Sequence, residues 1–446
     1  MDIDLEFEDV IATSRVAAPT RRKVIGLDDL VSDYYKEKEE ATKRSQKRGK
    51  HFQNSDSEED ERSNEAFLLR KIDECNDQMK DMDPEDEPCA TGLSLFGVQK
   101  VLPQIFCNIA SSSMVQRFRS NDLNSIFGLV RLEDTSFFEG LLVNGWLLKV
   151  VNASGKVDKV ICKWSFDLIM YSVKAELMLS AREFWSAVCE PKKVFDIQLE
   201  WVPAYSDLQQ AIEIYGYAFC TSTSEPAIEV SHCRGPPQNF CHWLKFVAMC
   251  FRNRCGMFAF TPKETESFLE IVISLSLDRN LQALLLLILE AVRSLINYFK
   301  EEEWNKSCRN VAANLAGRIP VDLNCLRVVE FIPVTCVRCS QLKSAISYHI
   351  LSVNLGCKGK KEEEMLSSLM AIKIKDRKCD LLKVYINMVL AEKWILWDPI
   401  SESKKEMNQK FGVFLRNCAS SISSSDMRTY ASKVRAKAAF LLHGFR

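Results

Sequence analysis

Residues 137–151, FFEGLLVNGWLLKVV, open the stretch that decides the fold. It continues as KWSFDLIMYSVKAELMLSAREFWSAV (163–188) and closes with LEWVPAYSDLQQAIEIYGYAF (199–219). Apolar residues recur at helical spacing in each run. Trp146, Trp164 and Trp185 lie among Leu, Ile, Phe and Val, so we expect them in a helical core, although Trp is also a frequent partner-binding residue.

The rest of the chain extends this helical pattern. Thr261-Pro262-Lys263-Glu264 predicts a helix start, because Thr and Glu can cap each other and Pro has no N–H to lose in the first turn. Asp278–Asn280 predicts a break. Sustained strand alternation is absent, so the prediction is an all-α fold of stacked helix pairs, a HEAT- or armadillo-like solenoid. Further helices are expected at 240–251, 281–304, 307–315, 323–331, 337–355, 361–374, 379–397 and 427–442.

Composition changes along the chain predict its domain organisation. Residues 1–90 carry most of the charge runs and few large apolar residues, which is typical of a disordered tail. A first helical half is expected at 91–220 and a second at 239–446. Residues 221–238, TSTSEPAIEVSHCRGPPQ, are rich in Ser, Thr, Pro and Gly. This composition predicts the linker loop between the halves.

The net charge and the cysteine content indicate which partners and which redox compartment to expect. The formal net charge is −1, so the overall basic balance of a simple nucleic-acid binder is absent. The 17 cysteines are irregularly spaced, and the acidic first ten residues do not form the apolar segment of a secretory signal. Both observations favour a reducing compartment. The apolar run 283–289 is too short to span a bilayer, and we expect a helix buried on most sides there, with no membrane partner.

Two features of the tail are candidate functional sites. Leu27, Leu30, Val31 and Tyr34 fall at i, i+3, i+4 and i+7, which predicts a short docking helix near 26–40 that binds a partner or packs on its own domain. Ser55 and Ser57 each precede an acid by three residues and are possible phosphorylation sites in an acidic linker. Basic runs at 21–23 and 43–50 suggest nuclear import.

Signals for chemistry are weak. Cys336-Val337-Arg338-Cys339 forms a CxxC that, with His232, Cys233, Cys241 and His242, suggests a zinc site; the pairs are about a hundred residues apart in sequence, so structural cysteines are the preferred interpretation. No phosphate-binding glycine loop occurs. We therefore predict no enzyme activity, no cofactor and no small-molecule substrate. Lys245, Arg252 and Arg254 are candidate phosphate contacts.

The order of the helical segments quoted at 137–219 resembles that in the helical domain of the sixth non-SMC element family of the SMC five–six complex. The resemblance is greatest to the short plant members of that family. The matching elements are Gly145-Trp146-Leu147, Trp201-Val202-Pro203 and Tyr215-Gly216, preceded by GLDDLVSDYYKEKEEATKR at 26–44. The resemblance covers about residues 92–220 and is fainter toward the C terminus. None of these motifs is catalytic.

The resemblance implies a nuclear, non-catalytic scaffold subunit. It would pair with the helical fifth non-SMC element, contact the SMC five–six ATPase subunits, and help recruit the complex to chromatin in DNA repair, with any DNA contact indirect. We expect the fifth element on a concave surface of residues 261–400. Two alternatives stay open: an unrelated helical-repeat adaptor, and a zinc-binding module around Cys336 and Cys339.

Overall fold

The structure is a computed structural model that describes residues 92–105, 109–119, 135–189, 197–218, 236–252, 258–357, 361–395 and 402–444. All of these residues lie in one compact unit, Pro88–Arg446. The tail at 1–90, with its expected docking helix, and most of the expected linker at 221–238 lie outside the described residues.

The described fold is all-α, as predicted. Its helical elements are η1 (Ile109–Ser111), α3 (Ser113–Arg119), α5 (Thr135–Val143), α6 (Trp146–Ser154), α7 (Lys159–Tyr171), α8 (Ala175–Cys189), α9 (Tyr205–Ile214), α10 (Asn239–Arg252), α11 (Pro262–Leu275), η2 (Arg279–Leu284), α12 (Leu285–Tyr298), α13 (Glu301–Ala316), α14 (Asn324–Phe331), α15 (Val337–Asn354), α16 (Glu362–Met370), α17 (Leu381–Ile395), α18 (Glu402–Ser421) and α19 (Ala431–Gly444).

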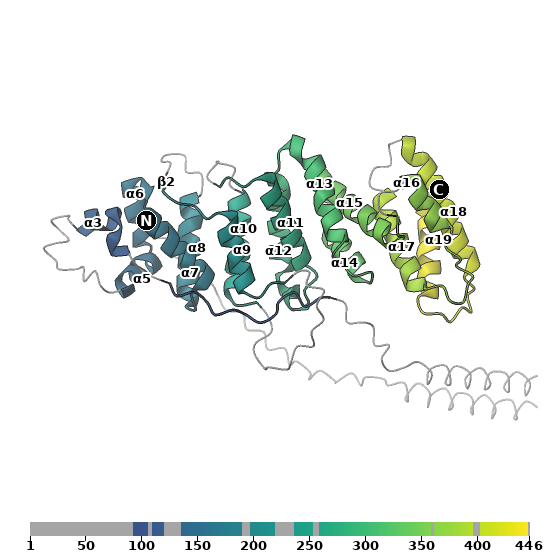
Figure 1. The fold of residues 1–446 in the computed structure, drawn as a ribbon, viewed down its shortest axis with the longest axis horizontal. Coiled ribbons are helices and arrows are strands. Elements are labelled where there is room, and N and C mark those ends of the chain that lie inside the picture. The colour runs from purple at the N-terminus through teal and green to yellow at the C-terminus, as the bar shows by residue number, and fades with distance from the viewer. Residues whose placement is uncertain are drawn as a thin grey trace, which may run out of the picture. The chain divides into compact units, whose positions relative to one another are not determined.

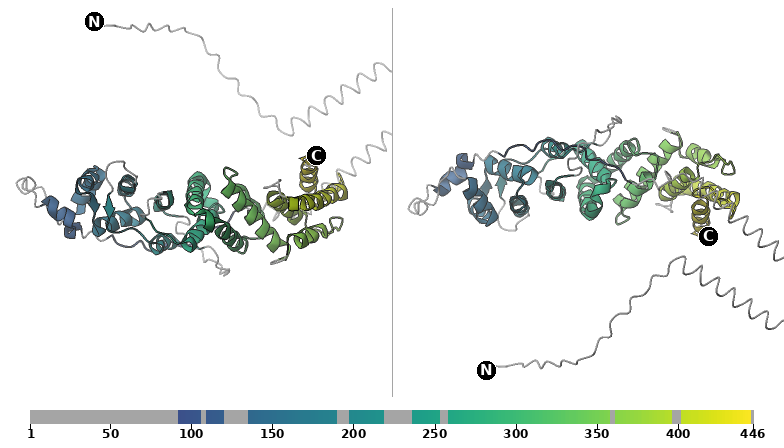
Figure 2. Two further views of the ribbon diagram at one scale, coloured as in Figure 1. Left: turned by 90° about the horizontal axis from the view of Figure 1, so that it is seen from above. Right: turned by 90° about the horizontal axis from the view of Figure 1, so that it is seen from below.

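Helices of Pro88–Arg446 stack on one another in chain order, which confirms the predicted solenoid. Helix α7 packs on α8, α10 contacts both of them and α12, and α11 packs on α12 and α13. The series continues through α13 with α15, α15 with α17, and α19 with α17 and α18. Figure 1 and both views of Figure 2 show this order from blue to yellow. One continuous apolar core joins the helices on both sides of the predicted linker.

The two strands in the described part of the chain are very short. Strand β1 (Lys156–Val157) pairs in parallel with β2 (Gln198–Leu199), in the register Lys156 to Gln198. They lie at the start of α7, where Asp158 is buried and accepts hydrogen bonds from the Ser112 hydroxyl (2.6 Å) and the Met114 N–H (2.9 Å). The Asp158 carboxylate therefore fastens the start of α3 to the start of α7.

Local signals set the helix ends where the chain supplies its own caps. The Thr261 hydroxyl accepts from the Glu264 N–H at 3.3 Å, and Glu264 accepts from the Thr261 N–H at 2.7 Å, so the predicted capping box is confirmed. The predicted break at 278–280 is the start of η2. Helix α6 runs to Ser154, and Gly155 ends it with a positive φ.

The prediction of one helix over 281–304 is wrong. The chain leaves helical geometry at Phe299, which ends α12, and α13 begins at Glu301. Glu301, Glu302 and Glu303 occupy the first turn of α13, where negative charge is favoured by the helix dipole. The run that we read as one helix therefore contains a helix start, and the separate helix expected at 307–315 is part of α13.

The segment Arg279–Tyr298 is, among the described residues, the one helical stretch long and apolar enough to cross a membrane by length and composition alone. Only 39% of its most apolar window is buried. Our expectation of a helix buried on most sides is therefore corrected. Helix α12 packs against α10 and α11, while Leu286 on its other face is 81% exposed.

Candidate partner-binding surfaces

The family-like residues Tyr215 and Gly216 hold an extended segment, Gly92–Lys100, that we call the strap. Helix α9 ends at Ile214, and Gly216 has φ +90°. The Gly97 N–H donates to the Gly216 carbonyl at 2.8 Å, and the Ala218 N–H donates to the Leu95 carbonyl at 2.9 Å. Figure 1 shows the strap as the dark blue trace running beneath the helices from α7 toward α12.

Only glycine fits where the strap crosses Gly216. A Cβ there would lie 2.9 Å from the Val98 carbonyl oxygen, closer than side chains normally approach backbone. The positive φ is also a conformation that residues with a Cβ rarely adopt. This glycine between two tyrosines therefore lies both at the end of α9 and at a tight backbone contact. Tyr215 itself is buried, and its hydroxyl donates to the Met170 carbonyl at 2.7 Å.

The other end of the strap is bound to the junction of α11 and η2. The Leu93 N–H donates to the Leu277 carbonyl (2.7 Å), and the Arg279 N–H donates to the Leu93 carbonyl (3.0 Å). The buried carboxylate of Asp278 accepts from the Leu95 N–H at 2.7 Å. The strap thus connects the end of α9, in the first helical half, to the second half.

Trp146 departs from the prediction of a core residue. Trp164 and Trp185 are buried, as expected, but Trp146 is 54% exposed. Gly145, with φ +71°, starts α6 so that Leu147 and Val151 form its buried stripe. Trp146 is one residue off that stripe, about 100° around the helix. The Lys149 Nζ lies 4.0 Å from its ring centroid, so the exposed ring is flanked by a cation.

Trp201 and Pro203 are placed for packing, because they lead the chain into α9. The half-buried Trp201 ring meets the Phe166 ring edge-to-face at a centroid distance of 5.6 Å, and Pro203 is buried. Together with Leu147 and Tyr215 they support the core. Trp146 is therefore the one large side chain of the three family-like motifs that lies mainly at the surface.

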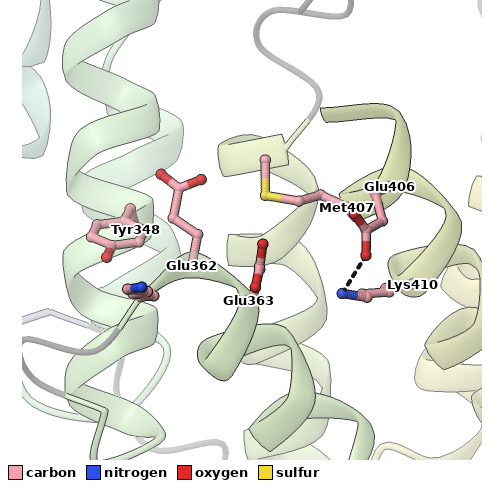
Figure 3. A pocket seen from close by; sticks show the side chains of 7 residues that line it. Tyr348, Glu362, Glu363, Glu406, Met407 and Lys410 are labelled. Atoms are coloured by element: carbon pink, nitrogen blue, oxygen red, sulfur yellow. Dashed lines mark ion pairs between the residues drawn. The ribbon is translucent and has the colours of Figure 1, made fainter. Parts of the chain in front are cut away.

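A hollow of about 380 Å³ lies between α15, α16 and α18, and we call it the acidic hollow. Figure 3 shows Tyr348 on α15, Glu362 and Glu363 on α16, and Glu406, Met407 and Lys410 on α18 around it; Lys361 completes the lining. Part of it belongs to the region 261–400, where we expected a partner surface.

Charge in the acidic hollow is only partly balanced. Lys410 Nζ lies 2.8 Å from Glu406 Oε1, and this hydrogen bond lowers the pKa of the Glu406 carboxyl. Glu362 and Glu363 are in the first turn of α16, where the helix dipole favours them. Burial, and then the charge of Glu362, raises the pKa of the Tyr348 hydroxyl. The hollow therefore presents carboxylates beside apolar Tyr and Met surface.

Sequence reasoning missed α18, which supplies three of the seven lining residues. The signal was present: Met407, Phe411, Phe414, Leu415 and Cys418 recur at helical spacing and are all buried. The charged first turns of α18 and Gly412 within it weaken the pattern. The expected helix at 427–442 starts later, at Ala431.

The cysteine pair of the CxxC lies at the start of α15. Cys336 is exposed, Cys339 is buried, and their Sγ atoms are 3.1 Å apart. Burial, and then the neighbouring Cys336, raise the pKa of Cys339 to about 11. His232 and Cys233 lie outside the described residues. Within the described ranges, no group of three or more His, Cys, Asp or Glu side chains is arranged to hold a metal ion.

The tail candidates Leu27, Leu30, Val31, Tyr34, Ser55 and Ser57 all lie outside the described residues, as does Arg254. Lys245 and Arg252 are described, and both are exposed on α10.

Comparisons with known proteins identify no family for this chain. No family model matches the sequence. No match is found among curated proteins either. The resemblance described above therefore stands on the motif residues alone.

Proposed function

We propose that this chain is a nuclear, non-catalytic scaffold subunit of an SMC five–six type complex. In this proposal it pairs with the helical fifth non-SMC element and contacts the ATPase subunits. Its role is to help recruit or load the complex on chromatin in DNA repair and genome maintenance. Contact with DNA is indirect.

The observation that carries the proposal is the exposure of Trp146 within the family-like Gly145-Trp146-Leu147 element. The positive φ at the start of α6 explains Gly145, and core packing explains Leu147, but neither explains an exposed Trp. Exposed Trp residues are enriched at the centres of protein interfaces, because a large rigid ring buries much area at little entropic cost. A stacked helical array offers the extended surface that a scaffold needs.

We assign the fifth-element contact to the helices of residues 261–400, with the acidic hollow at the C-terminal end of this surface. The hollow combines carboxylates with the apolar surface of Tyr348 and Met407, so it is suited to a partner helix that carries Lys or Arg beside apolar residues. The tail helix with Leu27 and Leu30 is assigned to a second contact in trans.

The deciding experiment is purification of the tagged chain from nuclear extract, with mass spectrometry of the proteins that co-elute. We expect the two SMC ATPases and a helical partner in near-equal amounts. Recovery of none of them, with the chain monomeric, would overturn the proposal. Deleting residues 1–90 should leave the heterodimer with the fifth element intact.

Variants of the two contacts separate the assignments. Glu362→Lys with Glu363→Lys should weaken capture of the fifth element, whereas Leu27→Asp with Leu30→Asp should weaken only the second contact. Helical content by circular dichroism should stay unchanged in both. Unchanged capture by the Glu362 and Glu363 variant would remove the acidic hollow from the proposal.

An unrelated helical-repeat adaptor is the main alternative, and recovery of a different set of partners would favour it. A zinc-binding module is the second alternative, suggested by the adjacent thiols of Cys336 and Cys339. Stoichiometric zinc in the purified protein, lost in a Cys336→Ser variant, would favour that module.

A further inference from the structure

Two adjoining hollows on the surface formed by α8, α10 and α12 carry a concentration of cationic side chains. Arg182, Lys245 and Arg252 line the first, with Glu290. Arg252 and Glu290 also line the second, together with Arg293. We call the surface defined by Arg182, Lys245, Arg252 and Arg293 the basic hollow.

Helical spacing and helix packing bring these residues together. Lys245, Met249 and Arg252 recur at i, i+4 and i+7 and form one stripe of α10. Helices α8 and α12 both pack against α10 and add Arg182 and Arg293 from either side. The sequence alone singled out Lys245 and Arg252 but could not place Arg182 or Arg293 beside them.

Carboxylates pair with only two of the four cations in this cluster. Glu290 pairs with Arg252, and the mainly exposed Glu183 lies 3.8 Å from Arg182. Within the described part of the chain, Lys245 and Arg293 form no ion pair. The Nε of Arg182 is buried and has no hydrogen-bond partner there.

The neighbouring His242 side chain lies in the positive electrostatic field of the same cluster. Burial, and then the charges of Arg182 and Lys245, lower the pKa of the His242 imidazole. An anionic group at this place would therefore meet an unsatisfied donor in a positive field.

Apolar residues share the lining of the first hollow with the charged ones. They are Ala248, Met249 and Leu287, and we call them the floor. A nucleic-acid backbone gains little from an apolar floor, because its outer surface is charged and hydrated. A peptide that carries both acidic and apolar side chains satisfies the floor and the cationic rim together.

We propose that the basic hollow binds an acidic, partly apolar peptide segment of a partner protein. Lys245 and Arg252 are two helical turns apart, about 10 Å. Two carboxylates three residues apart in a peptide of polyproline II conformation project to the same side and lie about 9 Å apart, close to that separation. One carboxylate meets Lys245 and Arg182, the next displaces Glu290 from Arg252, and the apolar residue between them lies on Met249 and Leu287. This site does not depend on the complex proposed above.

The test measures binding of the full-length chain to a short fluorescein-labelled peptide with Glu at every third position and Leu and Ala between. A second peptide with Gln in place of Glu is the uncharged comparison. We expect Lys245→Gln with Arg252→Gln to weaken binding of the Glu peptide by about tenfold or more, since charge-assisted hydrogen bonds are lost. Lys306→Gln, which removes an exposed lysine on α13, should leave it unchanged.

A variant that should strengthen peptide binding, rather than weaken it, makes the test specific for this surface. Glu290→Gln removes the internal competitor for Arg252 and should tighten binding of the Glu peptide. Equal binding of the Glu and Gln peptides, or no binding of either, would overturn the proposal. Duplex DNA that binds more tightly than the peptide and is sensitive to the same two substitutions would overturn it in favour of a nucleic-acid surface.

Discussion

The carboxylate of Asp278 accepts a hydrogen bond at 2.7 Å from the backbone N–H of Leu95, a residue 183 positions earlier in the chain. Both groups are buried. The same carboxylate accepts from the Asn280 N–H at 2.7 Å, which starts η2. One side chain thus starts η2 and anchors the strap that reaches back to Gly216.

Replacing Asp278 with Ala should free this end of the strap. The buried Leu95 N–H loses its partner, so we expect a loss of about 1–3 kcal/mol in the free energy of unfolding. Denaturant unfolding measures the loss, and hydrogen exchange should show reduced protection at 93–97. Asp376→Ala is the matched control. The Asp376 carboxylate accepts from the N–H two residues later, that of Lys378, as the Asp278 carboxylate does from Asn280, but Asp376 does not hold the strap. Equal effects of the two variants would contradict the anchoring role.

Gly216→Ala should destabilise the fold from the other end of the strap. The new Cβ would meet the Val98 carbonyl oxygen in a backbone conformation disfavoured for Ala, which we expect to cost about 1–3 kcal/mol. Gly140→Ala is the control, since a Cβ at Gly140 meets nothing within 4 Å in α5. That substitution should be neutral or stabilise by about 0.5–1 kcal/mol. Similar unfolding midpoints for the two variants would refute the close contact.

Trp146→Ala should separate binding from stability. Because the ring is 54% exposed, we expect little change in unfolding free energy but weaker recovery of partners from nuclear extract. Trp185→Ala should behave in the opposite way. Its ring is 1% exposed and its Nε1–H donates to the Ser165 hydroxyl at 3.0 Å, so truncation should cost about 3–5 kcal/mol. A large stability loss at Trp146 would indicate a packing role instead.

Asp158 should make stability depend on pH in the acid range. Burial alone would raise the pKa of its carboxyl, but hydrogen bonds from Ser112, Met114 and Ser113 outweigh burial and lower it below 3.8. A lowered folded-state pKa stabilises the fold above the unfolded value, and this contribution is lost as pH falls through 3.8 toward the folded-state pKa.

Asp158→Asn should therefore flatten the acid limb of the stability curve. Unfolding free energy measured in denaturant between about pH 6 and about pH 3 should fall less steeply in the variant than in the parent. Parallel curves for the two proteins would show that the carboxylate is not linked to folding in this range.

The sequence by itself determined the helical class and many helix ends. Period 3.6 in the apolar residues is a local property, and so is the reciprocal cap of Thr261 and Glu264, so both are readable without tertiary contacts. Gly216 could also be read locally, because a glycine between two tyrosines requires an explanation in backbone geometry. The helix α18 was readable in principle from the spacing of Met407, Phe411 and Cys418.

Only the tertiary structure decided which of these elements meet. The strap bonds join Leu95 to Asp278 and Gly97 to Gly216, and no short-range pattern records such distant pairs. The periodicity of apolar residues identifies the buried stripe of a helix. It does not show which other helix packs on that stripe or which residues at its edge stay exposed. That is why Trp146 was expected in the core and lies at the surface, and why Arg182 and Arg293 meet Lys245 and Arg252 only once α8, α10 and α12 pack.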